Sequence, residues 1–216
     1  MKISNIITTL LSGTYATLLI FFTTLIVSLP LGLLLTFPRM SKNKIVSSMT
    51  GFFISVLRGT PLMLQLIVWF FGPYYLFGIR LNTSWRVASV LIGFSINYAA
   101  YFAEIYRSGI QSIPKGQIEA ASVLGYTKLQ TFIKIICPQM IKIVIPPVTN
   151  EIISLIKDTS LAFVVAYTEM FTIAKQIAAA ETTVVPLFIA GLFYYIFNYL
   201  VAFIMERVEK AFNYYK

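Results

Sequence analysis

Residues 14–37 read TYATLLIFFTTLIVSLPLGLLLTF and contain no charged side chain. A helix needs about 20 predominantly apolar residues to cross the hydrocarbon core of a membrane, so this stretch is long enough for one crossing. A cleavable secretory signal has a shorter apolar segment, of about 7 to 15 residues, and a small-residue cleavage site, which does not follow here. We therefore expect an uncleaved membrane helix over residues 14–37.

The rest of the chain has the same apolar character. Of its 216 residues, 58% are hydrophobic and 12% are charged, whereas a typical soluble domain has about 25% charged residues. Further apolar blocks cover residues 46–77, 87–106, 144–174 and 184–205. The sequence thus predicts an all-α fold, a polytopic membrane bundle of about five helices that forms one domain over residues 1–216. So few crossings favour a chain that works within an assembly.

Two of the apolar blocks contain residues that interrupt helices. Residues 58–61 (Arg-Gly-Thr-Pro) and 72–73 (Gly-Pro) lie inside the block at 46–77. Proline removes a helical hydrogen bond and glycine loosens the backbone, so we expect the helix to bend, start or end at both places. The block at 144–174 contains several ionisable residues, and we expect it to be broken near Thr159-Ser160.

The 17 lysines and arginines indicate the orientation of the chain. Most of them follow the first block, follow the last block, or lie in the polar segment at residues 107–142. Cytoplasmic loops carry an excess of lysine and arginine, so we expect the N-terminus outside, the C-terminus in the cytoplasm and residues 107–142 on the cytoplasmic side. The net charge of +9 is explained in this way. Since no basic face is interleaved with aromatic residues, we expect no nucleic acid partner.

The residue inventory excludes several kinds of chemistry. The chain has no histidine and one cysteine, which rules out an internal disulfide, a histidine-based metal site and a catalytic Ser-His-Asp or Cys-His arrangement. No Gly-x-x-x-x-Gly-Lys-Ser/Thr phosphate-binding loop occurs. We therefore expect a chain that is not an enzyme and holds no metal or cofactor. Any ATP-driven work must be powered by another chain.

The polar segment at residues 107–142 contains the sequence IPKGQIEAASVLG at positions 113–125. Proline near the start and glycine past the end are typical of a short helix. A helix of about three turns is marginally stable alone in water and needs a surface to pack against. That surface is either the rest of the same loop or another protein.

The residues after this helix make the pattern more specific. Glu119-Ala120-Ala121 is followed by Gly125, Ile135 and Pro138. With this spacing the chain resembles the integral-membrane permease subunits of ATP-binding cassette (ABC) importers. Their signature is Glu-Ala-Ala, three residues, Gly, nine residues, Ile, one residue and Leu-Pro. Cys137 replaces the leucine of this signature, and a free cysteine behaves as a hydrophobic residue of smaller size.

Flanking motifs resemble the branch of these permeases that imports polar amino acids of the histidine, glutamine and arginine type. The matching segments are Arg58-Gly59-Thr60-Pro61-Leu62 with Gln65, Ile113-Pro114-Lys115-Gly116-Gln117, Pro138-Gln139, and Lys157-Asp158-Thr159-Ser160-Leu161 with Glu169. The resemblance implies a bacterial inner-membrane subunit whose loop helix, residues 112–126, docks on a dimer of ATP-binding subunits. It also implies an extracytoplasmic solute-binding protein and a second permease chain, either identical or closely related. Membrane lipid is the remaining expected partner.

The resemblance and the residue types together predict a coupling site on the loop. Small residues let a partner surface approach closely, and Glu119 can accept a hydrogen bond from it. The predicted coupling residues are Gly116, Glu119, Ala120, Ala121, Gly125 and Pro138.

A substrate path is predicted from polar residues inside the apolar blocks. An ionisable residue at the membrane centre costs at least about 2.5 to 3.5 kcal/mol and usually faces protein or a water-filled cavity. An amino acid zwitterion needs a cation for its carboxylate and an acceptor for its ammonium group, which Arg58 and either Asp158 or Glu169 could supply. The predicted path residues are Arg58, Gln65, Asn97, Asp158, Ser160 and Glu169.

Helical spacing places several polar residues of the block at 144–174 on one face, which we expect to turn inward. They are Asn150, Glu151, Ser154, Lys157 and Asp158. This face either lines the path or forms a structural network of charges. An alternative function is an ion-coupled secondary carrier that uses Glu151, Asp158 and Glu169. A membrane enzyme is disfavoured because the acids lie in apolar blocks.

Overall fold

The computed structural model describes residues 2–212, which form helices and connecting turns without any strand. The predicted all-α membrane bundle is confirmed. The helices are α1 (Ile3–Arg39), α2 (Lys44–Gly59), α3 (Leu62–Phe77), α4 (Thr83–Gln111), α5 (Lys115–Val123), α6 (Lys128–Thr131), a π-helical turn (Phe132–Ile136), α7 (Cys137–Asp158), a 3₁₀ helix (Thr159–Val165), α8 (Met170–Ala180) and α9 (Val185–Phe212).

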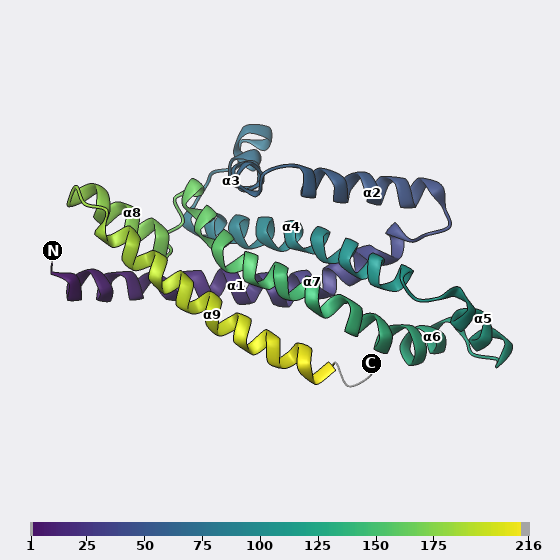
Figure 1. The fold of residues 1–216 in the computed structure, drawn as a ribbon. Coiled ribbons are helices and arrows are strands. Elements are labelled where there is room, and N and C mark those ends of the chain that lie inside the picture. Colours follow the sequence, from purple (N-terminus) through teal and green to yellow (C-terminus); the bar gives the residue numbers. More distant parts are fainter. Residues whose placement is uncertain (1, 213–216) are drawn as a thin grey trace.

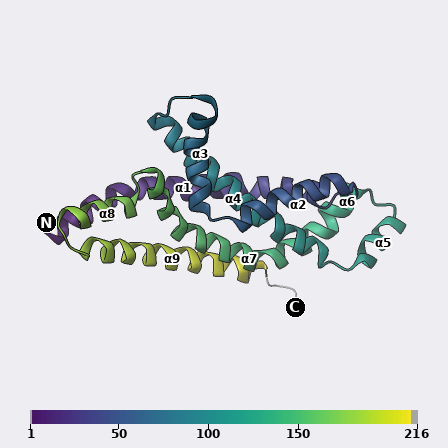
Figure 2. The same ribbon diagram turned by 90° about the horizontal axis from the view of Figure 1, so that it is seen from above.

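The long helices run along a common direction (Figure 1). Within residues 2–212, four helical segments are long and apolar enough to cross a membrane, and the bent pair α2–α3 raises the number to five. The beginning of α1 and helix α8 lie at one end of the bundle (Figure 1). The short helices α5 and α6 lie at the opposite end (Figures 1 and 2).

Helix α1 begins at Ile3, well before the expected start at residue 14. The reason is that Ile6 and Leu10 are buried against α8, while hydroxyl groups in the first turns bond to the helix backbone. The Thr8 hydroxyl donates to the Asn5 carbonyl at 3.0 Å, and the Thr9 hydroxyl donates to the same carbonyl at 2.8 Å. Polar residues of this kind are compatible with a helix that continues beyond the apolar stretch.

The block at residues 46–77 is broken once, not twice. Helix α2 ends at Gly59 and α3 starts at Leu62, with an angle of 107° between them. The expected interruption at residues 72–73 does not occur, because α3 continues through Pro73 to Phe77. Gly78 ends α3 instead, with a left-handed φ of 66°.

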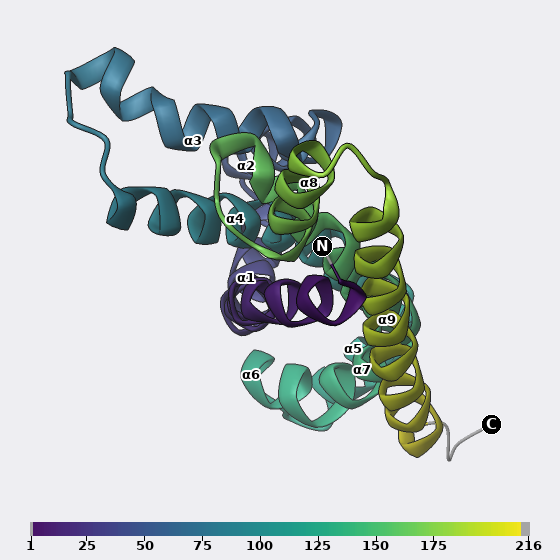
Figure 3. The same cartoon turned by 90° about the vertical axis from the view of Figure 1, so that its left-hand side faces the viewer.

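Helix α3 and the start of α4 project together from one side of the bundle (Figure 3). The Trp85 indole nitrogen donates to the Phe70 carbonyl at 3.0 Å, and the Arg86 guanidinium lies 5.6 Å from the centre of the Phe70 ring. Asn82 begins α4 by accepting a hydrogen bond from the Trp85 amide at 2.7 Å. Helix α4 therefore begins before the expected residue 87 and ends beyond residue 106.

The polar segment at residues 107–142, which we expect to contain a short helix, is largely helical. Helix α6 continues through the π-helical turn into α7, so this long helical segment begins at Lys128. A capping box between Thr127 and Gln130 forms its N-terminus. At the other end, the regular helix stops at Asp158 and changes to the 3₁₀ helix at Thr159, where the break was expected.

Close packing of α1 against α4 forms the centre of the bundle. A Cβ atom on Gly32 would lie 2.7 Å from the Phe102 Cβ, so only glycine fits there without a shift. Four residues later, the Thr36 hydroxyl donates to the Ala103 carbonyl at 3.1 Å. Small residues of this kind allow two membrane helices to approach each other closely. The rigid pair positions the polar residues on the other faces of α4.

Candidate functional site

A polar cavity of about 550 Å³ lies where the α2–α3 break, the middle of α4 and the end of α7 meet. Its size is within the range of small-molecule sites. Its lining residues are Arg58, Gly59, Thr60, Pro61, Leu62, Asn97, Tyr98, Tyr101, Glu151, Ser154, Asp158 and Leu161. Three predicted path residues, Arg58, Asn97 and Asp158, therefore line one cavity.

Two buried amides hold the break between α2 and α3. The Gln65 amide nitrogen donates to the Leu57 carbonyl at 2.8 Å and to the Thr60 carbonyl at 3.1 Å. The Asn97 amide nitrogen donates to the Leu57 carbonyl at 3.1 Å and to the Gln65 side-chain oxygen at 3.0 Å. Carbonyls that lose their helical partner within a membrane need such donors. Gln65 thus supports the cavity from behind and does not line it.

Arg58 lies at the end of α2, at the edge of this break. Its guanidinium carbon lies 5.3 Å from the centre of the Tyr101 ring, within the range of a cation–π contact. Within residues 2–212, Arg58 forms no ion pair. Its charge is therefore available to an anionic group in the cavity.

The end of α7 supplies the acidic side of the cavity. The Tyr98 hydroxyl donates to an Asp158 carboxylate oxygen at 2.7 Å. Glu151 and Ser154 line the same wall, two turns and one turn before Asp158, respectively. The cavity thus places one guanidinium opposite two carboxylates.

The polar face of α7 turns inward in part, toward the polar cavity, and is in part exposed. Ile152, Leu155 and Ile156 are buried in the core, whereas Asn150 and Lys157 are exposed. The apolar face packs on α4 and α9 because this chain has enough apolar surface to cover it. Glu151, Ser154 and Asp158 of the polar face line the polar cavity, whereas Asn150 and Lys157 form an exposed edge of this face.

Besides Gln65, the structure places two further predicted path residues, Glu169 and Ser160, outside the cavity. Glu169 is fully buried and caps α8, accepting hydrogen bonds from the amides of Phe171 and Thr172 at 2.7 Å each. Its carboxylate also accepts hydrogen bonds from the Thr172 hydroxyl at 2.9 Å and the Tyr194 hydroxyl at 2.7 Å. Glu169 therefore caps α8 and does not line the polar cavity, contrary to the prediction that it is a path residue. Ser160 donates to the Lys157 carbonyl at 2.7 Å and is not among the lining residues.

Sequence reasoning did not name Tyr98 and Tyr101 as site residues. Tyr98 orients Asp158 and Tyr101 supports Arg58, so both position the charged groups. Tyr101 follows Asn97 by four positions and Tyr98 by three on one helix, and this spacing was the available signal, since residues three and four positions apart share a face. Glu151 and Ser154 were assigned to the polar face of α7, and both reach the cavity.

The predicted coupling residues lie on and beside α5. Gly116, Glu119 and Ala120 are exposed, and Pro138 is exposed at the start of α7, whereas Ala121 is buried. Gly125 ends α5 with a left-handed φ of 79°. The surrounding amides form a Schellman motif, in which Tyr126 donates to the Ala121 carbonyl at 3.0 Å and Gly125 to the Ser122 carbonyl at 3.1 Å.

Helix α5 is attached to the bundle by few contacts. The Gln139 amide nitrogen donates to the Gln117 side-chain oxygen at 2.6 Å. Ile113, which precedes α5, is buried in a cluster with Ile136 and Met140. One side of α5 is therefore fixed to the start of α7, and the other side is open.

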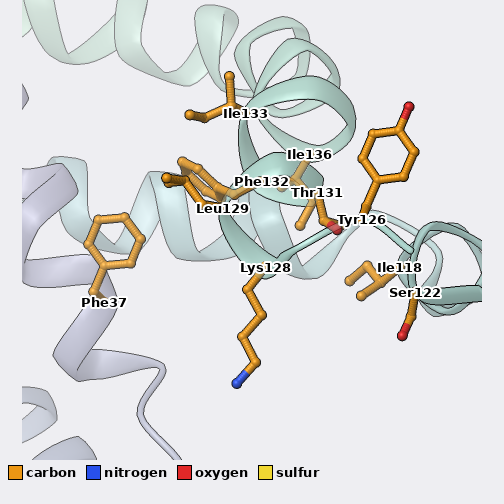
Figure 4. Close-up of a pocket in the computed structure, with 10 residues that line it drawn as sticks. All are labelled: Phe37, Ile118, Ser122, Tyr126, Lys128, Leu129, Thr131, Phe132, Ile133 and Ile136. Atoms are coloured by element: carbon orange, nitrogen blue, oxygen red, sulfur yellow. The ribbon is translucent and has the colours of Figure 1, made fainter. Parts of the chain in front are cut away.

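An apolar hollow of about 840 Å³ lies beside α5 (Figure 4). Phe37 at the end of α1 forms one wall, Ile118 of α5 forms another, and Leu129 lies between them (Figure 4). The neighbouring side chains of Val123 and Leu124 are 88% and 76% exposed. Exposed apolar surface of this kind marks an interaction site.

No metal site accompanies these features. Among residues 2–212, no group of three or more histidine, cysteine, aspartate or glutamate side chains is placed to hold a metal ion. The chemistry that the arrangement permits is therefore binding of a zwitterion in the polar cavity and docking of a partner at the α5 end.

Comparison with known proteins shows the family of this chain. A sequence family described as "Binding-protein-dependent transport system inner membrane component" matches residues 28–214. The chain is 38% identical to the probable amino-acid ABC transporter permease protein YckA of Bacillus subtilis (strain 168), over 95% of this chain and 89% of that protein. It is 36% identical to the putative glutamine transport system permease protein GlnP of Rickettsia bellii (strain RML369-C), over 97% and 95% of the two chains.

The fold is also similar to that of a solved transporter. A chain in the crystal structure of an amino acid ABC transporter with histidines superposes with a TM-score of 0.84. The two sequences are 28% identical, and the match covers 94% of each chain.

Proposed function

The chain belongs to the family of binding-protein-dependent transport system inner membrane components and is a permease subunit of an ABC importer for polar amino acids. We propose that its polar cavity binds the transported amino acid and that its α5 end couples transport to the ATPase. It is a multi-pass protein of the bacterial inner membrane that works with ATPase subunits, a substrate-binding protein and a second permease. It is not itself a catalytic enzyme. The ion-coupled carrier is not supported, and the internal hydrogen bonds of Glu169 argue against its use as a coupling site.

The observation that carries the proposal is the opposition of Arg58 to Glu151 and Asp158 in one cavity. Arg58 binds the substrate carboxylate, since a guanidinium matches a carboxylate in charge and geometry. Asp158, held by Tyr98, accepts a hydrogen bond from the substrate ammonium group. Two acids to one cation favour an amino acid with a cationic side chain, such as arginine.

The exposed edge of the polar face of α7 supports a path between two permease chains. Asn150 and Lys157 are exposed on this face, and a polar face is costly against lipid. A second copy of this chain, or a close relative, covers it and leaves a hydrated path between the two. The exposed apolar side chains of α9, among them Phe188 and Tyr199, contact membrane lipid instead.

The α5 end is the proposed site of energy coupling. The open side of α5 docks on one subunit of an ATPase dimer, with Glu119 as a hydrogen-bond acceptor and Gly116 and Ala120 as the close-contact surface. ATP is bound and hydrolysed by that partner, and this chain carries no cofactor or metal. The α5 end lies in the cytoplasm with the C-terminus, and the N-terminus lies outside, where the solute-binding protein delivers the substrate.

The test is uptake by the importer reconstituted with its ATPase and its solute-binding protein. We predict that Asp158→Asn lowers ATP-dependent uptake of arginine at least about tenfold and lowers glutamine uptake less, because a hydrogen bond to a charged group contributes about 1.5 to 3 kcal/mol. Ser160→Ala, two residues away and outside the cavity, is the matched control and retains uptake. Unchanged uptake of both amino acids by Asp158→Asn would remove Asp158 from the path.

A further inference from the structure

A second, smaller polar cavity lies beside the first. It measures about 370 Å³ and is lined by Arg39, Gly51, Ile54, Ser55, Arg58, Gly59 and Glu104. We call it the arginine cavity. Arg58 and Gly59 line both cavities, so the two are adjacent and share one cation.

The arginine cavity lies nearer the α5 end than the polar cavity does. Arg39 is the last residue of α1, whose first residues lie at the opposite end of the bundle (Figure 1). On α4, Glu104 follows Asn97 and Tyr101 of the polar cavity by two turns and one turn. These residues share a face of α4, because positions three and four apart are neighbours. One polar face thus leads from the first cavity to the second.

The charge in the arginine cavity is opposite to that in the polar cavity. Glu104 accepts a hydrogen bond from Arg39 at 3.2 Å, and its other oxygen is paired with Arg107 at 2.6 Å. The Glu104 carboxylate therefore pairs with both Arg39 and Arg107, and Arg58 adds a further positive charge to the cavity. A surplus of positive charge remains, whereas two carboxylates face one guanidinium in the polar cavity.

The position of Arg39 depends on a glycine. A Cβ atom on Gly51 would lie 3.1 Å from the guanidinium carbon of Arg39, so the missing side chain lets the guanidinium lie against α2. Arg39 also donates to the Ser47 hydroxyl at 3.3 Å. The guanidinium is thus held at the wall of the cavity, with a side-chain exposure of 30%.

We propose that the arginine cavity is a second station for the carboxylate of the transported amino acid, which passes from Arg58 toward Arg39 on its way to the cytoplasm. The zwitterion first lies with its ammonium group at Glu151 and Asp158 and its carboxylate at Arg58. The carboxylate then enters the arginine cavity first, because this cavity has a surplus of positive charge. The ammonium group leaves Glu151 and Asp158 afterwards. This inference rests on the proposed function, and it adds a binding site and a direction of exit.

The test uses the reactivity of one position inside the arginine cavity. Cys137 is the only cysteine in the chain, so Cys137→Ser gives a background without thiols. Ser55→Cys then places a thiol in the arginine cavity, and Ser48→Cys places one on the same side of α2, two turns away and outside both cavities. The complete importer, with its ATPase subunits, is labelled in nanodiscs with a sulfonate-bearing and with a trimethylammonium-bearing thiol reagent.

We expect the anionic reagent to be favoured over the cationic one at Ser55→Cys at least about tenfold more than at Ser48→Cys, since charged walls concentrate the opposite charge. L-Arginine should slow labelling of Ser55→Cys, and L-argininamide, which lacks the carboxylate, should not. Equal reagent preference at the two positions, or equal protection by the two compounds, would overturn the proposal.

Lipid phosphate is the other anionic group that could bind these arginines, and the nanodisc composition separates the two sources. In phosphatidylcholine nanodiscs, protection by L-arginine supports the substrate station. Protection that appears only with phosphatidylglycerol, without any amino acid, overturns it in favour of a lipid site. If the importer with wild-type sequence shows no ATP-dependent amino acid uptake, the proposed function fails. If uptake is normal and the labelling pattern is absent, only this inference fails.

Discussion

Gly125 ends α5 with a φ of 79°, a backbone conformation that glycine adopts at low cost. Nothing lies within 4 Å of the place where its Cβ would be, so the chain itself leaves room for a side chain. The requirement for glycine therefore lies in the backbone conformation, or in the space that a docking partner needs. Gly116, at the other end of α5, also has open space but no left-handed φ, and so makes a matched comparison.

We predict that Gly125→Ala lowers uptake and substrate-stimulated ATPase activity, because a left-handed alanine costs about 1 to 2 kcal/mol. Gly125→Asn should retain more activity than Gly125→Ala, since asparagine tolerates this conformation. Gly125→Asp, which adds both a side chain and a charge, should abolish both activities without preventing membrane insertion. Normal activity of Gly125→Asp would contradict the docking role of α5.

At the scale of the element, the most informative feature is the break between α2 and α3. Prolines and glycines in the sequence predict a break at residues 58–61, and the structure has it there. The same residue types at 72–73 do not break α3. The difference is tertiary: Gln65 and Asn97 donate to the freed carbonyls at the first position. Local sequence cannot reveal such donors, because Asn97 comes from another helix.

We predict that Gln65→Leu lowers uptake at least about tenfold, because it leaves the Leu57 and Thr60 carbonyls with fewer donors, at about 1 to 3 kcal/mol for each unsatisfied group. Arg58 would then be displaced from the cavity wall. Leu64→Ala, at the preceding and exposed position, is the control and should retain uptake. Uptake assays and thermal unfolding in detergent are measured together. A Gln65→Leu variant with full uptake would contradict the role of Gln65 in holding the break between α2 and α3.

Apolar length and charge placement predicted most of the elements, but not the surroundings of single polar residues. Glu169 illustrates the limit. An acid in an apolar block indicates either a cavity or a buried cap, and only the fold brings the Tyr194 hydroxyl and the α8 amides to it. The exposure of Asn150 and Lys157 on α7 was missed for the same reason. Helical periodicity separates a polar face from an apolar face, but it does not tell which face meets the core and which meets another chain.

At the scale of the whole molecule, a single chain forms only part of the proposed substrate path. The polar cavity, the arginine cavity and the exposed polar residues of α7 lie on surfaces that residues 2–212 leave uncovered. Soluble proteins expose such a face to water, but a membrane helix must direct it to protein or to an aqueous path. A second permease chain therefore completes the path in the proposed assembly.

We predict that Asn150→Cys, on the exposed polar face of α7, reacts with a hydrophilic thiol reagent in the assembled importer, in a Cys137→Ser background. Leu192→Cys on α9 is also exposed in the single chain, but it faces lipid and should not react. The reaction is followed by intact-protein mass spectrometry. Equal labelling of both positions in the intact importer would contradict the assignment of the two faces.

The helical segment at Lys128–Val165 has one further consequence. At about 1.5 Å per residue, this segment of 38 residues is roughly 55 Å long. Its first turns lie next to α5, and Asp158 lies near its far end. In the proposed assembly, a movement that the ATPase imposes on α5 is therefore transmitted along this helical segment to Asp158, the proposed substrate ligand. Between Lys128 and Asp158, the π-helical turn at Phe132–Ile136 is the only departure from α-helical geometry, and it lies on the α5 side of the segment.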